Sequence, residues 1–269
     1  MTPSITPKRN PKASRIPSSL RRIAAGAGVA LFWLLVWEGA ALLIRQELLL
    51  PTPLAVLAAL GRLIQTALFW KAAGLSLLRI VCGFLAAVAV GCAAAVLTAR
   101  FSLARALLAP VLHIVRAAPV ASFIVLALIS FPNDNLLTVF IAFLMVIPIV
   151  WANVEKGIRE TDSSLLEMAR VYRFGRWKTL LRVQLPSVMP YFLTACTTGL
   201  GFAWKSGIAA EVLCQPKLSI GTQLWEAKAS LEFPEMIAWT AAVIALNILL
   251  EKGLLRLAKH LGRRYNAAQ

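Results

Sequence analysis

The feature that most constrains this chain is a series of six long apolar stretches. They lie at residues 23–44, 75–98, 106–131, 136–154, 191–213 and 236–250. A transmembrane helix needs about 20 consecutive, mostly apolar residues, and most of these stretches meet that requirement. Hydrophobic residues make up 59% of the 269 residues and charged residues only 15%, whereas soluble domains carry about 25% charged residues. The sequence therefore predicts an all-α membrane protein with six transmembrane helices, and it argues against a soluble enzyme.

The basic residues indicate how these helices are oriented. The net charge is +16, and 20 of the 28 lysines and arginines fall in four segments. These segments are the first 22 residues, the second-to-third connection, the fourth-to-fifth connection and the residues after the sixth stretch, 251–269. Lysine and arginine accumulate in cytoplasmic loops. All four segments share a side only if both termini are cytoplasmic, so the charge is explained by the membrane and no nucleic-acid partner is expected.

Four segments of different character follow from this pattern. Residues 1–22 are predicted to be a basic, disordered cytoplasmic tail. Residues 23–72 hold the first transmembrane helix and an external interfacial segment with a short helix at 54–63. Residues 73–257 hold the other five helices, and residues 258–269 form a second basic cytoplasmic tail. The hydrophobic runs show no internal repeat of the kind found in many secondary carriers.

The connection between the fourth and fifth stretches, residues 155–190, is long and patterned. Ser164-Leu165-Leu166-Glu167 matches a capping box, which predicts that a helix starts there. Apolar residues then follow at helical spacing through Met168, Ala169 and Tyr172, until Gly175 interrupts the pattern. A second short amphipathic piece is expected to end at Leu185-Pro186. From periodicity alone, a helix lying on lipid is an equally good interpretation.

This connection resembles the cytoplasmic "EAA" loop of ABC importer permeases. Glu167-Met168-Ala169 and Leu185-Pro186 match its pattern of E-A-A, three residues, G, nine residues and I-x-L-P. That register places Arg173 at the glycine position, with Gly175 two residues later. Three further segments resemble the nitrate, sulfonate, taurine and bicarbonate permeases: Leu78–Phe84, Arg116–Pro119 and Ala203–Glu211.

The resemblance implies a type I ABC importer permease (MetI-like) fold, in which this loop forms coupling helices that sit on a cytoplasmic ATPase subunit. We call residues 155–190 the coupling loop. By resemblance, Glu167, Ala169 and Gly175 contact or shape the joint, and Pro186 ends the second helix. The candidate coupling residues are Ser164, Glu167, Met168, Ala169, Arg173, Gly175, Leu185 and Pro186.

The resemblance also implies three partners besides the lipid bilayer of a prokaryotic plasma (inner) membrane. They are a pair of ATPase subunits, an extracytoplasmic substrate-binding protein and a second permease chain, most simply an identical one. The sequence contains no G-x-x-x-x-G-K-[ST] motif, so ATP and Mg²⁺ are expected on the ATPase. No cofactor, catalytic residue or metal site is expected in this chain, because it shows neither a catalytic arrangement nor metal-ligand spacing.

Charges inside the apolar stretches indicate a translocation path. An ionisable side chain at mid-membrane costs about 2.5–3.5 kcal/mol on insertion scales, so it needs a partner or a wet cavity. The candidate path residues are Arg116, Pro119, Trp204, Lys205 and Glu211. For the charges, the alternative is pairing between helices or snorkelling, and snorkelling or a gate position is expected of Glu211. For Trp204 the alternative is buried packing.

Two further expectations concern helix geometry. Arg116 with Pro119 predicts that the third helix is broken or kinked, because proline removes a backbone hydrogen bond. Gly199, Gly201 and Gly207 are expected to let the fifth helix approach its neighbours.

These features predict the permease subunit of an ATP-driven importer that moves a small anionic solute by alternating access. The resemblance implies a solute such as nitrate, a sulfonate, taurine or a vitamin precursor. The main rival is an ion-coupled secondary carrier, for which Glu38 offers an intramembrane carboxylate. A membrane enzyme is a weaker rival, and so is a membrane anchor for a soluble partner.

Overall fold

The computed structural model describes residues 18–46, 49–131 and 133–266, and every regular element in those ranges is a helix. Residues 1–17 of the predicted basic tail lie outside the described residues, whereas residues 18–22 begin the helix α1 and are therefore not disordered. The predicted C-terminal tail begins inside a helix that ends at Asn266. The chain divides into two units, residues 1–55 and 56–269, each described here by itself.

The first unit is an apolar helix followed by a turn. The helix α1 (Ser18–Ile44) contains the segment Gly26–Ile44, which is long and apolar enough to cross a membrane. In the turn, the Trp37 indole donates a hydrogen bond to the Pro51 carbonyl at 3.1 Å. The Thr52 hydroxyl accepts a hydrogen bond from the Ala55 N–H and so caps α2 (Pro53–Ile64). The helix α2 spans the division between the two units. The predicted short helix is confirmed, with a proline at its first position, where no N–H is needed.

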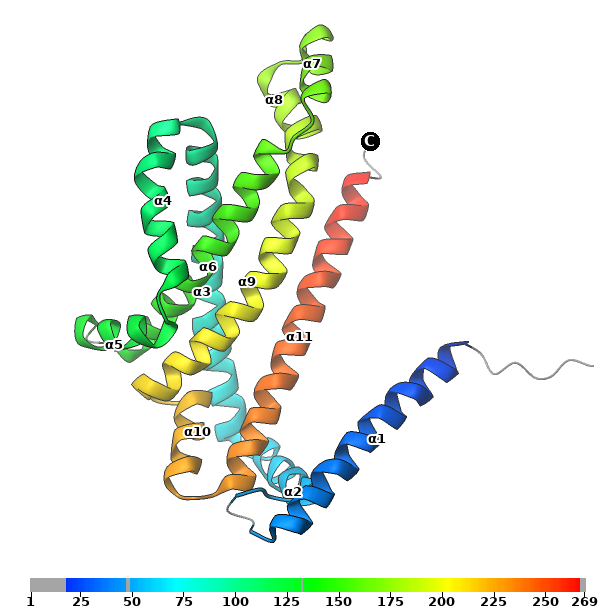
Figure 1. Cartoon of the computed structure of the whole chain (residues 1–269), viewed down its shortest axis with the longest axis vertical. Coiled ribbons are helices and arrows are strands. Elements are labelled where there is room, and N and C mark those ends of the chain that lie inside the picture. The colour runs from blue at the N-terminus through cyan, green and yellow to red at the C-terminus, as the bar shows by residue number, and fades with distance from the viewer. Residues whose placement is uncertain (1–17, 47–48, 132, 267–269) are drawn as a thin grey trace, which may run out of the picture. The chain divides into compact units, whose positions relative to one another are not determined.

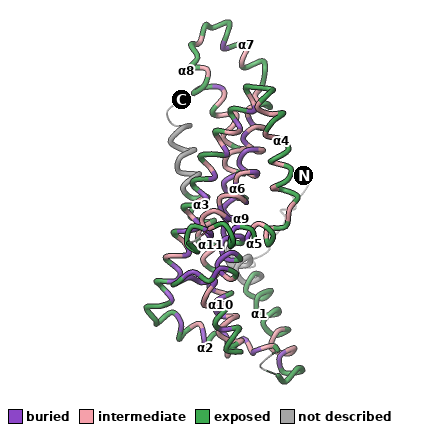
Figure 2. Tube along the Cα trace, turned by 90° about the vertical axis from the view of Figure 1, so that its left-hand side faces the viewer, coloured by how far each residue is buried: buried purple, intermediate pink, exposed green. Residues whose placement is uncertain are grey.

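Three long helices form the centre of the second unit: α3 (Ala67–Arg100), α6 (Asp134–Arg159) and α9 (Leu185–Cys214). They run beside one another in Figure 1, and the buried residues in Figure 2 concentrate along them. Their apolar sequences supply the core of this unit, because helices without a polar face must cover themselves with protein or lipid.

Small residues let these helices approach closely. A Cβ placed on Gly207 of α9 would lie 2.5 Å from Cγ1 of Ile80 on α3. A Cβ on Gly199 would lie 3.1 Å from Cγ1 of Val146 on α6, whereas one on Gly201 would meet nothing within 4 Å. The predicted packing role is therefore confirmed for Gly207 and Gly199 but is wrong for Gly201, whose position is open.

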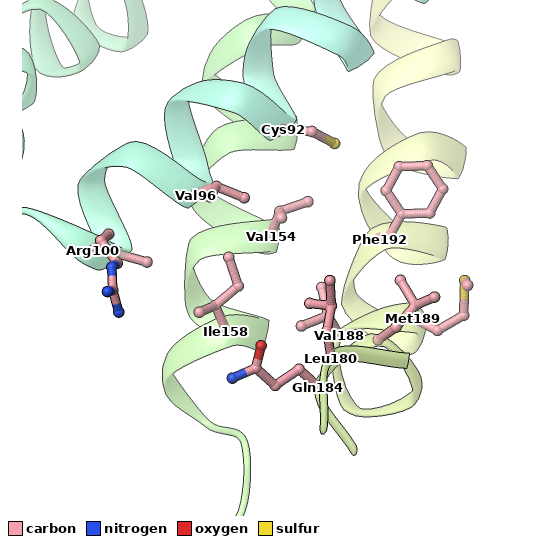
Figure 3. Close-up of a pocket in the computed structure, with 12 residues that line it drawn as sticks. Cys92, Val96, Arg100, Val154, Ile158, Leu180, Gln184, Val188, Met189 and Phe192 are labelled. Atoms are coloured by element: carbon pink, nitrogen blue, oxygen red, sulfur yellow. The ribbon is translucent and has the colours of Figure 1, made fainter. Parts of the chain in front are cut away.

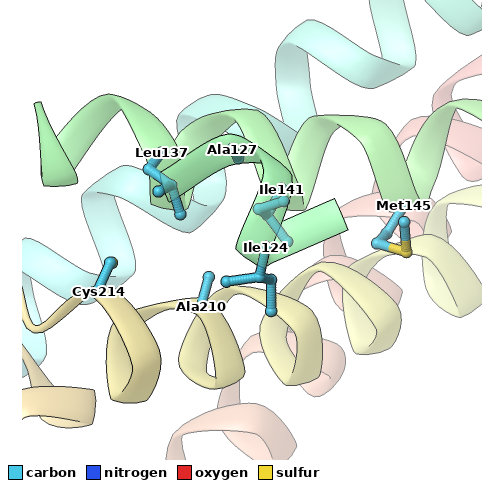
Figure 4. Packing of buried hydrophobic residues seen from close by; sticks show 7 residues of the cluster. All are labelled: Ile124, Ala127, Leu137, Ile141, Met145, Ala210 and Cys214. Carbon is cyan, nitrogen blue, oxygen red and sulfur yellow. The ribbon is translucent and has the colours of Figure 1, made fainter. Parts of the chain in front are cut away.

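The predicted break in the third apolar stretch is confirmed. The helices α4 (Ser102–Ala117) and α5 (Val120–Ser130) meet at an angle of 104°. Ala118 is extended, with ψ 141°, because the following Pro119 disfavours a helical residue before it and has no N–H to donate. Figure 4 shows how α5 then packs across α6 and α9. The cluster consists of Ile124, Ala127, Leu137, Ile141, Met145, Ala210 and Cys214.

The coupling loop and α10 lie at opposite ends of the second unit (Figure 1). The coupling loop folds into α7 (Ser163–Val171), α8 (Arg176–Thr179) and a π-helical turn η1 (Leu180–Gln184), beyond the end of α6. At the opposite end, α10 (Ile220–Ala229) connects α9 to α11 (Phe233–Asn266), which runs beside α9.

Not every predicted span has the length and composition of a membrane-crossing helix. Within the described ranges, four helical segments do: Gly26–Ile44, α3, α6 and Phe233–Arg256. The bent pair α4–α5 makes a fifth if it counts as one span. The helix α9 has 30 residues but is not among them, because hydroxyl-bearing residues, prolines, Lys205 and Glu211 reduce its hydropathy.

Candidate functional site

The first helix of the coupling loop begins two residues earlier than the capping-box pattern predicts. Asp162 is the N-cap of α7, and its carboxylate accepts the Ser164 N–H at 2.8 Å. Ser164 is thus inside the helix and not its cap, so that prediction was wrong. Asp162 is as good a cap as serine and stands directly before the helical run. Glu167 is exposed, and the structure gives its carboxylate no partner among the described residues.

Most apolar side chains of the coupling loop face outward. Ala169 is buried, at 1% exposure, so it attaches α7 to the rest of the loop. Met168 on the same helix is exposed. At the tip, Val171 is 78% exposed, Tyr172 71% and Trp177 77%. Contiguous exposed apolar side chains on a soluble loop mark a surface that another molecule covers.

The turn between α7 and α8 is made without glycine. Arg173, at the glycine position of the permease pattern, has a left-handed backbone with φ 53°. The Phe174 N–H bonds to the Ala169 carbonyl at 2.8 Å, and the Arg173 N–H bonds to the Arg170 carbonyl at 2.9 Å. These two bonds form a Schellman motif, the usual glycine-based helix ending. Gly175 is extended, with φ −63°, so it does not supply the turn.

This turn predicts that glycine is more stabilising than alanine at position 173, whereas alanine is more stabilising than glycine at position 170. Arg173→Gly should be more stable than Arg173→Ala by about 1 kcal/mol, since a left-handed residue with a Cβ costs about 1–2 kcal/mol. At Arg170, inside α7, the order should reverse, because glycine costs about 1 kcal/mol relative to alanine in a helix. Thermal unfolding of the four variants in detergent measures both differences. The same order at both positions would contradict the turn geometry.

The second part of the coupling loop continues into the membrane helix. α8 passes through η1 directly into α9, and Pro186 lies in the first turn of α9. The prediction that Pro186 ends the second helix was wrong, because the chain stays helical through this proline. The π-helical turn η1 directly before it changes the hydrogen-bond register where Pro186 lacks an N–H. Leu185 is where α9 begins, and Val183 before it is buried. A movement of α8 is therefore passed to α9 without a flexible linker.

The two ends of the coupling loop are held together at its base. Tyr191 at the start of α9 donates a hydrogen bond from its hydroxyl to Glu160 at the end of α6. Its ring lies so close to Gly157 that a Cβ there would be 2.9 Å from Tyr191 Cδ2. Glu155 accepts a hydrogen bond from Arg105 Nε at 3.0 Å and forms an ion pair with Arg159 at 3.3 Å. Side-chain contacts with α4 and between α6 and α9 thus fix the base of the loop.

The candidate path residues do not form one cluster. Arg116, at the end of α4, donates from Nη2 to the Pro148 carbonyl at 2.9 Å. Lys205 is exposed on α9, and Pro119 is exposed at the break between α4 and α5. Trp204 is buried at 1% exposure and donates from Nε1 to the Val243 carbonyl of α11 at 3.1 Å, which is the packing alternative. The structure records no hydrogen bond or ion pair between any two of the five residues within its described ranges.

Glu211 does not snorkel, so the expectation of snorkelling was wrong; the structure shows the alternative, pairing between helices. Its side chain is fully buried, and Oε2 accepts a hydrogen bond from Ser76 Oγ at 2.6 Å and from the Gly221 N–H at 3.3 Å. Arg79 of α3 forms an ion pair with Oε1 at 3.3 Å. A buried carboxylate needs such partners, because removing an ion from water costs several kcal/mol.

Arg79 is the functional candidate that the sequence analysis missed. Besides Glu211, it donates to the carbonyls of Lys217 and Leu218 at 3.1 and 3.5 Å, and Ser76 Oγ accepts the Ile220 N–H at 2.9 Å. This polar cluster ties α3 and α9 to the loop before α10. The available signal was the charge of Arg79 inside the second apolar stretch, which required a partner at the same depth.

Comparison with known proteins identifies the family. Residues 80–266, most of the second unit and all of the coupling loop, match the model described as "Binding-protein-dependent transport system inner membrane component". The chain belongs to this family. The matched region begins within α3 and continues to the end of α11.

Several proteins similar to this chain are named as transport permeases. The chain is 26% identical over 185 residues to the bicarbonate transport system permease protein CmpB of Synechococcus elongatus, covering 69% of this chain and 66% of that protein, slightly under two thirds of its length. It is 28% identical to the nitrate import permease protein NrtB of Leptolyngbya laminosa over 68% of this chain and 65% of the relative. It is also 26% identical to the taurine transport system permease protein TauC of Escherichia coli over 90% of both.

Proposed function

We propose that this chain is the membrane-spanning permease subunit of an ATP-driven importer. Two copies would enclose one pathway in a prokaryotic plasma membrane and move a small anionic solute by alternating access. The names of the relatives, which refer to bicarbonate, nitrate and taurine, support an anionic solute. An extracytoplasmic binding protein would deliver the solute, and a pair of ATPase subunits would bind ATP and Mg²⁺. This chain itself would catalyse no reaction.

The observation that carries the proposal is the coupling loop, whose base is fixed by side-chain contacts and whose tip exposes apolar side chains. Val171, Tyr172 and Trp177 together present an apolar surface that needs a cover. Energy from a separate ATPase must reach the membrane helices as movement. The contacts at the base of the loop and the continuous helical run from α8 into α9 would transmit such movement. Glu167, which has no partner among the residues that the structure describes, adds a carboxylate for a polar contact at the same joint.

We propose six crossings with both termini on the cytoplasmic side. The ion pair between Arg105 and Glu155 brings the connection after α3 to the base of the coupling loop. The two basic connections therefore share one end of the second unit, as the distribution of cytoplasmic lysine and arginine requires. The helix α9 is the fifth crossing in this arrangement, and its charge at Glu211 is compensated by Arg79.

We propose that Arg116 and Lys205 line the path in the two-chain assembly. Both are exposed in the single chain, and both carry the charge that an anionic solute needs. The Arg116 side chain stands at the break between α4 and α5, where the backbone departs from a regular helix. Such interruptions at membrane depth are tolerated where they line a cavity or are buried in protein.

The experiment tests whether variants with bulky side chains in the coupling loop still co-purify with the partner ATPase. Glu167→Trp combined with Gly175→Trp should abolish stable co-purification with the partner ATPase and ATP-dependent uptake in vesicles. Both positions are exposed, and a Cβ on Gly175 meets nothing within 4 Å, so the fold should tolerate the change. Gly61→Trp, at another exposed and open glycine, is the matched control and should leave both readouts intact.

Two outcomes would contradict the proposal. Normal ATPase capture by the double variant would remove the coupling loop from the joint. Uphill uptake in vesicles that contain no ATPase would instead favour the ion-coupled carrier, and in that case Glu38→Gln becomes the first variant to test.

A further inference from the structure

An apolar cavity of about 530 Å³ lies where α3, α6 and α9 meet below the coupling loop. Its lining includes Val96 from α3, Ile158 from α6 and Phe192 from α9 (Figure 3). Arg100 and Gln184 are its polar side chains, and Figure 3 shows Arg100 near one edge of the view, with Gln184 on the coupling-loop side. The cavity is therefore apolar, with the cationic side chain of Arg100 at one edge, and we call it the slot.

A second cavity, of about 590 Å³, adjoins the slot and is basic. It shares Arg100, Leu180 and Gln184 with the slot and adds Arg170 from α7 and Arg176 from α8. No acidic side chain lines it. Within the described ranges, the structure gives the three arginines neither an ion pair nor a side-chain hydrogen bond. Three guanidinium groups around one cavity form a site for a multivalent oxyanion.

The depth of these two cavities follows from the sequence. Before Arg100, α3 has an uncharged run from Ile80 to Ala99, and α6 has one from Asn135 to Val154 that ends at Glu155. Each run has the ~20 residues that span a ~30 Å hydrocarbon layer. Arg100 and Glu155 therefore lie at the boundary between hydrocarbon and headgroups. The part of the slot lined by α3, from Cys92 to Ala99, lies on the hydrocarbon side of this boundary. The arginine cavity, lined by residues of α7 and α8, lies on the headgroup side.

We infer that an anionic phospholipid binds here, with an acyl chain in the slot and its phosphate among Arg100, Arg170 and Arg176. A soluble anion makes no use of the slot, and an apolar helix makes no use of three arginines. An open apolar groove of about 520 Å³ on the neighbouring side of α3 shares Cys92, Val96 and Arg100 with the slot. It offers a place for the second acyl chain. Basic clusters beside cytoplasmic membrane surfaces attract anionic lipids electrostatically.

The lipid would connect elements that have few direct contacts. Arg100 belongs to α3, whereas Arg170 and Arg176 belong to the coupling loop. One phosphate bound to all three would tie the loop to the helix bundle and set its resting position. The inference depends on the chain crossing a membrane with this end at one surface. It does not depend on ATP-driven transport.

The test is lipid retention by the full-length chain in mild detergent, measured by native mass spectrometry. Wild type should retain added phosphatidylglycerol in preference to phosphatidylcholine. The triple variant Arg100→Gln, Arg170→Gln and Arg176→Gln should bind phosphatidylglycerol at least about tenfold more weakly, since each lost charge-assisted hydrogen bond weakens binding. The matched control, Arg173→Gln with Lys178→Gln and Arg182→Gln, removes the same charge from exposed positions outside the cavities. It should change retention less than twofold.

A second pair of variants tests the slot. Ala99→Trp fills it and should reduce retention, whereas Leu107→Trp at an exposed position of α4 should not. Equal retention of the two lipids, or equal losses in the two triple variants, would overturn the inference. Displacement of the lipid by glycerol 1-phosphate at similar concentration would show a free-anion site instead. A lipid-free dimer that Ala99→Trp dissociates would show that a second copy of the chain covers the slot.

Discussion

Arg79→Met is expected to lower the free energy of unfolding by about 3–5 kcal/mol, because it leaves Glu211 as a buried charge without its counter-ion. Glu211 is fully buried, and Arg79 is its only cationic partner among the described residues, with 3.3 Å between Nη1 and Oε1. The same substitution removes the bonds from Arg79 to the carbonyls of Lys217 and Leu218. The loop before α10 should therefore become accessible to protease together with the loss of stability.

A double variant separates the charge effect from simple packing. Arg79→Met combined with Glu211→Gln removes both charges and keeps an amide oxygen that can accept from Ser76 Oγ and the Gly221 N–H, so it should recover part of the lost stability. Lys205→Met is the control, since it removes an exposed charge from the same helix as Glu211. Unfolding by SDS in mixed micelles measures all of these variants. A double variant no more stable than Arg79→Met would contradict the ion-pair account.

Gly83→Ala is the second change with a large expected effect. Gly83 lies where α3 crosses α6, and a Cβ there would lie 2.4 Å from the Val139 carbonyl oxygen and 2.9 Å from Ala142 Cβ. The obstacle is backbone, so the helices must separate. Overpacking of this kind costs about 1–3 kcal/mol. We expect a loss of that size in the free energy of unfolding, measured in the same mixed micelles.

The same helix contains the control for this prediction. Gly74 lies in α3, and a Cβ placed on it would meet nothing within 4 Å, so Gly74→Ala extends into open space. It should stabilise the chain by about 0.5–1 kcal/mol, because alanine loses less conformational freedom than glycine in a helix. Opposite signs for the two substitutions are the expected result. Equal effects would show that α3 and α6 are not closely packed at Gly83.

The site was predictable wherever the signal was local. The helices of the coupling loop, the break at Pro119 and the short helix before α3 all follow from proline placement and helical spacing. Exact ends were less predictable, because Asp162 and Ser164 are comparable caps separated by two residues. The register of the permease pattern put its glycine position at Arg173, but the sequence analysis placed the interruption of the helix at Gly175. Only the backbone dihedrals show that Arg173 adopts the left-handed conformation typical of glycine.

By itself, the sequence determined that the chain is apolar and helical and that most of its basic residues cluster in four segments, since these properties depend on residue type and on periods of a few residues. The tertiary structure decided which buried charges meet. Arg79 and Glu211 are 132 positions apart, so no periodicity relates them, and their pairing depends on the contact between α3 and α9. It also decided that Arg100 joins Arg170 and Arg176 around one cavity. The electrostatic energy of two charges depends on the distance between them and on their burial. For residues far apart in the sequence, both are set only when the helices pack together.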